Sequence, residues 1–178
     1  MRVAAIMASL VFACSLLSAA TLEKLSLDEM ALKSTEIVLG RVVSKGYQQR
    51  GSVIYTVARI QVSERWKGNA KDIVDVSVAG GVFNGVRQVF PGSPFFRDGH
   101  EYLFFLWTGR SGNTQVIGLS QGLFDVKSSA KGETQVYRGA SAETMLDKSG
   151  RRIGDESSQM SLDEMRAYVR RVLGGARE

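Results

Sequence analysis

The chain has one histidine, His100, and it stands close to two carboxylates, Asp98 and Glu101. An imidazole beside a carboxylate is the arrangement of a general base. No nucleophile motif accompanies it, because the sequence contains no G-x-S-x-G, Walker loop, G-x-G-x-x-G or H-E-x-x-H. We therefore expect His100 to be a surface residue in a turn before a strand. A hydrolase with a dispersed site around His100 is kept as an alternative.

The sequence also lacks the residues that a metal site or thiol chemistry needs. Cys14 is the single cysteine, whereas zinc sites draw on several Cys or His ligands. The carboxylate pairs Asp28/Glu29 and Asp163/Glu164 follow serines at the start of expected helices, where acidic side chains cap the helix and favour its dipole. The sequence thus predicts no catalytic residue, no metal site and no cofactor, and a protein that is not an enzyme.

The segment from Ala79 to Gly99 is the most informative part of the chain. It holds both prolines, five glycines and seven large apolar residues, and it is longer than most connections in a compact domain. Two roles are open: the segment folds over and seals the core, or it binds a partner protein. In the second case the expected contact residues are aromatic, namely Phe83, Phe90, Phe95 and Phe96.

Residues 1–20 have the pattern of a secretory signal peptide. Arg2 supplies the positive start, and the uncharged, almost wholly apolar run Val3–Leu17 is shorter than the roughly 20 residues that span a bilayer. Small residues end the segment at Ser18-Ala19-Ala20. We expect cleavage after Ala20 and export to the periplasm or the extracellular space.

Cleavage there leaves residues 21–178, enough for one domain with a sizeable core. Losing Arg2 lowers the formal net charge from +5 to +4, a mild and dispersed excess that does not suggest a nucleic-acid partner. No later stretch is long and apolar enough for a transmembrane segment. Lipidation of Cys14 is an alternative to cleavage, although the bulky Phe12 fits a lipoprotein site poorly.

The elements that position these residues are mostly strands. Apolar and polar side chains alternate along Val53–Trp66 and Asp72–Ala79, the period of strands with one buried face. Glu36–Ser44 is rich in Ile and Val and is expected to form a hairpin with Val53–Trp66. Glu101–Thr108 is apolar on both faces, as expected of a central strand. Shorter strands are predicted at 114–119, 123–127 and 134–138.

Two helices are expected to flank the strands. The letters Ser-Leu-Asp-Glu-Met begin both, at 26–30 and 161–165, with the spacing of a capping box. Short strands in hairpin order predict a mainly β fold, a small antiparallel OB-like barrel or sandwich with a short N-terminal helix and a C-terminal amphipathic helix. The expected layout is a signal peptide at 1–20, the β domain at 21–138, a polar, poorly ordered linker at 139–160 and the helix at 161–173.

Two of the strands resemble those of a group of bacterial exported domains. Ser34–Val42 resembles their opening strand, and Tyr55–Thr56 with Ile60–Gly68 resembles their second. Those domains are similar to the netrin-like module, the OB-type barrel shared with tissue inhibitors of metalloproteinases. The resemblance covers residues 34–127 and implies the fold. It does not imply the inhibitory chemistry, which uses an N-terminal cysteine, because the expected mature N-terminus is Thr21.

The function expected from these features is that of an exported, non-enzymatic binding module. Its partner would be another protein, such as a secreted protease, contacted through the 79–99 segment. An OB-like barrel often binds nucleic acid, but the export signal argues against that partner. Besides the hydrolase, an envelope-associated structural protein is the alternative.

Overall fold

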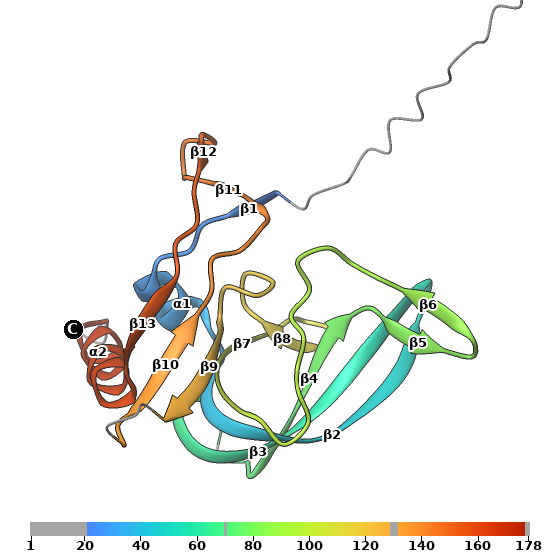
Figure 1. Cartoon of the computed structure of the whole chain (residues 1–178), viewed down its shortest axis with the longest axis horizontal. Coiled ribbons are helices and arrows are strands. Elements are labelled where there is room, and N and C mark those ends of the chain that lie inside the picture. Colours follow the sequence, from blue (N-terminus) through green and yellow to red (C-terminus); the bar gives the residue numbers. More distant parts are fainter. Residues whose placement is uncertain (1–20, 70, 129–131, 177–178) are drawn as a thin grey trace, which may run out of the picture.

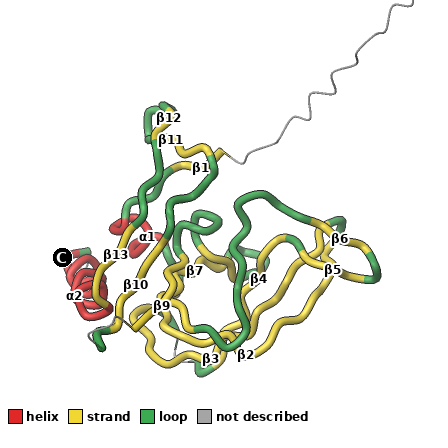
Figure 2. The backbone as a smooth tube through the Cα atoms, viewed as in Figure 1, coloured by secondary structure: helices red, strands yellow, loops and turns green. Residues whose placement is uncertain are grey.

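The computed structural model describes residues 21–69, 71–128 and 132–176. The expected signal peptide at 1–20, and Cys14 with it, lies outside the described residues. Within them the backbone is mainly β, with one short helix near the N-terminal side and a longer helix at the C-terminal side (Figures 1 and 2). The mainly β prediction and both helices are therefore confirmed.

The elements follow one another in this order: β1 (Thr21–Glu23), α1 (Leu27–Lys33), β2 (Glu36–Arg50), β3 (Val53–Lys67), β4 (Ile73–Ala79), β5 (Gly81–Phe83), β6 (Val86–Gln88), β7 (Glu101–Thr108), β8 (Thr114–Val116), β9 (Leu123–Ser128), β10 (Thr134–Arg138), β11 (Thr144–Leu146), β12 (Arg152–Ile153), β13 (Ser158–Ser161) and α2 (Leu162–Gly175).

The large sheet is antiparallel, in the order β13-β10-β9-β7-β2-β3-β4, with β8 also paired to β7. It curves strongly, so that β2 and β3 sweep from the helices at one end of the molecule toward β5 and β6 at the other (Figure 1). Its end strands, β13 and β4, do not pair with each other. No closed barrel is found among the strands that the structure describes.

The central strand is β7, as its sequence predicted. Tyr102, Phe104 and Leu106 are buried on one face, and Leu103 and Phe105 are buried on the other. A strand with apolar side chains on both sides needs a packed layer against each side. Both faces of the sheet are accordingly covered at β7.

Two cores result. One lies between the sheet and the helices, where Met30 of α1 and Met165 and Val169 of α2 pack on Leu103 and Phe105. The other lies inside the curve of the sheet, and we call it the inner core. Its buried members are Val38, Val42, Ala58, Ile60, Val74, Val76, Val78, Phe96, Tyr102, Phe104, Leu106 and Val116. Two faces of one sheet thus provide the packed interior of the domain.

The β2–β3 hairpin is longer than expected, because pairing continues to Arg50 and Val53 with a turn of only two residues. Register shifts interrupt the pairing at three places along β2. Ile60 faces the inner core, yet Trp66, also at an even position, packs on the helix side. We expected all even-numbered side chains of β3 to share one face. That expectation is wrong for the part of β3 past the register shifts, because a bulge changes the face on which each later side chain lies.

Both helices begin with the predicted capping box. The Ser26 Oγ accepts a hydrogen bond from the Glu29 N–H at 3.2 Å, and the Ser161 Oγ accepts one from the Glu164 N–H at 3.1 Å. Arg166 of α2 then joins the helix to β3 through Glu64, with an N–O distance of 2.8 Å. In the described part of the chain, no helix has the length and apolarity needed to cross a membrane.

The segment expected as a polar linker, 139–160, contains strands in the structure. β11 pairs in parallel with β1, and β13 adds to β10 at the edge of the large sheet. Met145 is buried, and the Asp155 side chain is only 1% exposed against Arg138. The composition of the segment does not reveal this order, because its partners lie elsewhere, in β1 and in β10.

Candidate binding groove

The 79–99 segment begins with a tight hairpin. β5 and β6 are joined by Asn84 and Gly85, which both have positive φ, at 48° and 77°. This is the backbone of a two-residue type I′ turn, for which Asn-Gly is the preferred sequence. The first half of the segment is therefore a projecting ribbon.

The ribbon is fastened to the β2–β3 hairpin through Gln88. Its side-chain oxygen accepts a hydrogen bond from the Ile54 N–H at 2.7 Å, and its amide donates to the Ser52 carbonyl at 2.8 Å. The Thr56 hydroxyl adds a bond of 2.8 Å to the Gly80 carbonyl. These bonds hold both sides of the ribbon's base.

Phe96 anchors the other end of the segment in the inner core. It is 3% exposed and packs edge-on against Tyr102 and Phe104, with ring centroids 6.2 and 5.7 Å apart. The Tyr102 hydroxyl accepts a hydrogen bond from the Arg97 N–H at 3.1 Å. This part of the segment seals the core, which was one of the two roles left open by the sequence.

Lys45 of β2 holds the same end from outside. Its ammonium donates to the Phe96 carbonyl at 3.0 Å and lies 3.2 Å from an Asp98 carboxylate oxygen. It also stands 5.2 Å from the centre of the Phe95 ring, a cation–π contact. Phe95 is thus positioned, although most of its surface faces solvent.

Two glycines permit close approaches around these anchors. A Cβ on Gly81, whose φ is +141°, would lie 2.8 Å from the Tyr47 ring, so the missing side chain gives that ring its place beside β5. A Cβ on Gly92, whose φ is +76°, would lie 2.5 Å from Leu119 and 2.9 Å from Glu143. The close approach at Gly92 lets the middle of the 79–99 segment pack on Leu119 and Glu143, which lie much later in the chain.

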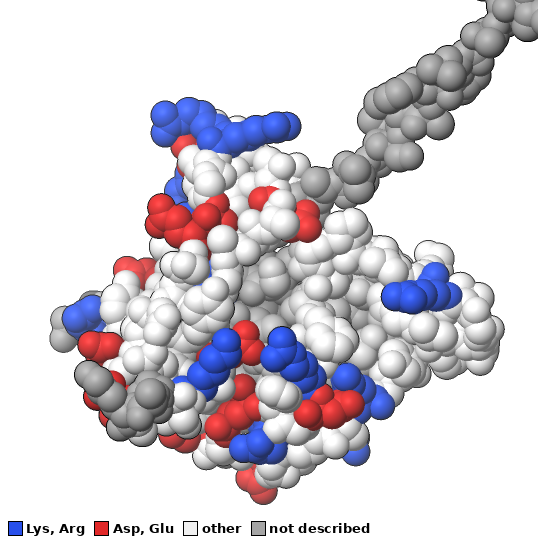
Figure 3. Space-filling view, in the orientation of Figure 1, with Lys and Arg blue, Asp and Glu red and all other residues white. Residues whose placement is uncertain are grey.

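Between the anchors lies a groove of about 320 Å³, which we call the apolar groove. Its lining includes five exposed large apolar side chains, with these exposed fractions: Tyr47 51%, Val82 48%, Val89 72%, Phe90 38% and Phe95 75%. Figure 3 shows a hollowed face whose centre carries little charge, between the charged lower edge and the charged upper projection. Contiguous exposed apolar surface of this kind marks interaction sites on soluble proteins.

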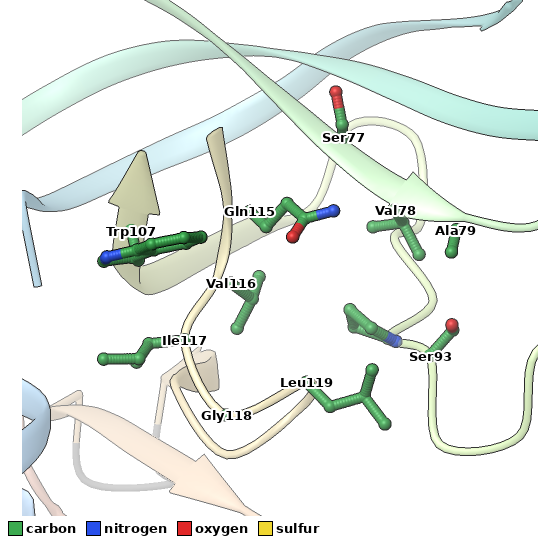
Figure 4. A pocket seen from close by; sticks show the side chains of 11 residues that line it. Ser77, Val78, Ala79, Ser93, Trp107, Gln115, Val116, Ile117, Gly118 and Leu119 are labelled. Carbon is green, nitrogen blue, oxygen red and sulfur yellow. The ribbon is translucent and has the colours of Figure 1, made fainter. Parts of the chain in front are cut away.

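A second pocket of about 210 Å³ adjoins the groove and shares Val78, Ala79, Ser93 and Pro94 with it. β4 and β8 line its two sides; Gln115 points from β8 toward β4, and Leu119, in the loop after β8, points toward Ser93 (Figure 4). None of its lining residues is charged. The apolar surface therefore continues from the groove toward β8.

The four aromatic residues predicted to contact a partner do not share one environment. Phe90 and Phe95 line the groove and are exposed, whereas Phe83, in β5, is half-buried outside its lining. Phe96 also lines the groove, but as its almost fully buried floor. Phe96 therefore belongs to the core, because its ring is enclosed by Tyr102 and Phe104.

Sequence reasoning missed the groove residues outside the phenylalanines. Asn84-Gly85 between apolar residues is a strong hairpin signal, and it would have divided the segment into a ribbon carrying Val82 and an anchored loop carrying Val89. Tyr47 was missed because the β2 strand continues past the expected turn at Gly46. No local signal places Tyr47 beside Val89.

The residues around His100 do not assemble as a general base. Asp98 pairs with Lys45, and Glu101 accepts a hydrogen bond from the Ser63 hydroxyl at 3.1 Å. His100 is exposed, lines neither apolar pocket, and has its ring centre 6.4 Å from that of Tyr102. Among the described residues, no group of three or more His, Cys, Asp or Glu side chains is placed to hold a metal ion.

Comparison with known proteins adds no relative. The chain matches no protein-family model, and neither the curated proteins nor the solved structures give a significant match to it. Proposals on function consequently rest on the geometry of the groove.

Proposed function

We propose that this protein is an exported, non-enzymatic binding module that holds a partner protein, such as a secreted protease, in the apolar groove. One observation carries the proposal: five exposed large apolar side chains line a single groove, and four of them lie on a segment that is fastened at both ends. Single exposed apolar residues are ordinary, but their concentration at one hollow is not.

The fastening supports binding as well as folding. Phe96, Gln88 and Lys45 fix the backbone on either side of Val89 and Phe90 before any partner arrives. A loop that is already ordered loses little conformational entropy on association, so more of the apolar contact energy appears as affinity. Aromatic side chains on such loops are the usual anchors of protein interfaces.

The proposal includes an incomplete OB-like barrel as the scaffold. β4 and β8 lie beside each other without forming a ladder, and the inner core fills the space enclosed by β7, β2, β3 and β4. The adjoining pocket then occupies the open seam between β4 and β8, and the apolar groove borders it at Val78 and Ala79. Binding loops at a barrel opening are a common use of such folds.

Capture of partners from the exported fraction tests the function. We expect proteins retained by the unaltered chain to be lost with a Val89→Ser/Phe95→Ser double variant, since both side chains are largely exposed and the anchor Phe96 is untouched. Leu32→Ser on α1 is the matched control, because Leu32 is also an exposed apolar residue, at 46%, but lies away from the groove. Equal retention by the double variant and the unaltered chain would refute the proposal.

Export has a separate test. N-terminal sequencing of the protein recovered outside the cytoplasm is expected to start at Thr21. A chain that keeps Met1 and stays in the cytoplasm would contradict export. A lipid-modified Cys14 would instead support the envelope-associated alternative.

A further inference from the structure

The charges around the apolar groove are one-sided. Its lining contains two basic residues, Lys45 and Arg87, and no acidic residue. The adjoining pocket adds no charge of either sign. An occupant that brings a carboxylate would therefore meet basic and no acidic side chains in the lining, and the Asp98 carboxylate beside Lys45 is already paired.

The two basic groups differ in availability. Lys45 is already used, because it binds the Phe96 carbonyl and pairs with Asp98. Arg87, in β6, is exposed, and none of the acidic groups that the structure describes pairs with it. Its guanidinium is left to bind a carboxylate from outside, for which its planar fork is well suited.

The shape of the site favours a polypeptide over a single acyl chain. Val89 and Phe95 keep 72% and 75% of their surface exposed, so the apolar surface extends well above the groove floor. A cavity of about 320 Å³ is at the small end for enclosing a lipid-sized ligand. β4, which lines the groove with Val78 and Ala79, is also an end strand of the large sheet, and its outer edge forms no ladder with any other strand that the structure describes. An edge of this kind can pair with an extended chain.

We infer that the groove takes an extended peptide segment of the partner in which an Asp or Glu stands next to large apolar side chains. The apolar side chains contact Tyr47, Phe90 and Phe95, and the carboxylate pairs with Arg87. This inference rests on the proposed function and adds the chemistry of the partner's contact segment to it.

A random 12-residue peptide library displayed on phage provides the probe. Peptides are selected on the whole exported chain, and those that also bind the Val89→Ser/Phe95→Ser variant are discarded. We expect the remaining sequences to be enriched in Asp or Glu beside apolar residues. A selected peptide, synthesised with its acidic residue and with the matching amide, then gives dissociation constants by fluorescence anisotropy.

Arg87→Glu decides the charge assignment. The acidic peptide is expected to bind about fivefold more tightly than its amide form, and this preference should disappear in Arg87→Gln. Arg87→Glu should instead prefer a version carrying Lys. Arg152→Glu, which makes the same change of charge on the distant β12, should keep the original preference.

Each other outcome overturns the inference in a recognisable way. Groove-dependent peptides with no acidic preference would refute the charge assignment and leave the proposed function intact. Failure to select any groove-dependent peptide would refute the assignment of a peptide to the groove. The proposed function would then still be tested by the capture experiment described above. A dimer dissolved by Val89→Ser/Phe95→Ser, or a lipid found on the purified chain, would show a different occupant.

Discussion

Phe95 and Phe96 are neighbours in the sequence and stand in opposite environments, with 75% of Phe95 exposed and 3% of Phe96. The two side chains meet different surroundings, so one dipeptide serves two purposes. Phe96 closes the inner core against Tyr102 and Phe104. Phe95 stays on the groove beside the Lys45 ammonium. The two roles left open for the segment are therefore divided between adjacent residues.

That division predicts unequal effects on stability. Phe96→Ala should lower the free energy of unfolding by about 3–5 kcal/mol, because it opens a cavity in a closed core. Phe95→Ala should change it by within about 0.5 kcal/mol, since its ring is largely in solvent. Urea melts of the two variants measure both values. Similar losses from both changes would mean that the two rings are packed alike.

The burial of both faces of β7 predicts that truncating a side chain on either face lowers the free energy of unfolding by a similar amount. Phe104 fills the inner core and Phe105 the core under the helices, and both have 0% exposure. Phe104→Ala and Phe105→Ala should each cost about 3–5 kcal/mol in urea melts. Arg59→Ala, on the outer face of β3, should cost no more than about 0.5–1 kcal/mol, because its pair with Asp75 is exposed. A larger loss from Arg59→Ala than from Phe104→Ala would contradict the register.

Asp155 predicts a loss of stability in acid. Burial raises the pKa of its carboxyl, but hydrogen bonds from Arg138 and the Ser141 N–H, with the Arg138 charge, outweigh burial and lower the pKa from 3.8 to about 2. A carboxyl with a lowered folded-state pKa contributes stability that is complete above its unfolded value. The contribution should thus decline as the pH falls from about 4 through 2.

The measurement compares urea melts at pH 7 and at pH 2–4. Asp155→Asn should cost about 3 kcal/mol at pH 7, because Arg138 is left partly buried without its ion pair, and should show a smaller decline in acid than the unaltered chain. Asp75→Asn removes an exposed pair and serves as the control, with an expected cost of at most about 1 kcal/mol. Identical acid profiles for the unaltered chain and Asp155→Asn would refute the assignment.

The repeated capping boxes predict equal penalties at two sites that are far apart in the sequence. Ser26→Ala and Ser161→Ala each remove the hydroxyl that accepts the third backbone N–H of a helix, and each should cost about 1 kcal/mol of unfolding free energy. Ser128→Ala, at the exposed end of β9, should cost less than about 0.5 kcal/mol and is the control. A cost of Ser161→Ala no greater than that of Ser128→Ala would show that the cap contributes nothing.

Most of the secondary structure could be predicted from local patterns. The capping boxes, the alternation of β3 and β4 and the two-sided apolar run of β7 are all properties of short stretches. Barrel closure could not be predicted, because it depends on whether the end strands meet. The order in 139–160 was missed for the same reason, since β11 needs β1 as its partner and Asp155 needs Arg138.

The candidate site was predicted only in part. The unusual composition of 79–99 drew attention to a segment that lines the groove, and Phe90 and Phe95 are among the lining residues. The sequence could not separate Phe95 from Phe96, because two adjacent phenylalanines carry no signal of which one faces the core. Tyr47 and Lys45 come from a strand more than thirty residues earlier, and only the fold brings them to the segment.

The parallel pairing of β1 with β11 ties the order of folding to the direction of synthesis. Thr21 pairs with Thr144, so the first described strand of the chain waits for a partner that emerges more than a hundred residues later. α1 waits similarly for α2, and the edge of β2 that faces away from β3 waits for β7. Contacts of such long sequence separation form slowly, because long loops must close first. A growing chain therefore stays incompletely paired until the segment that contains β11 and α2 has been made.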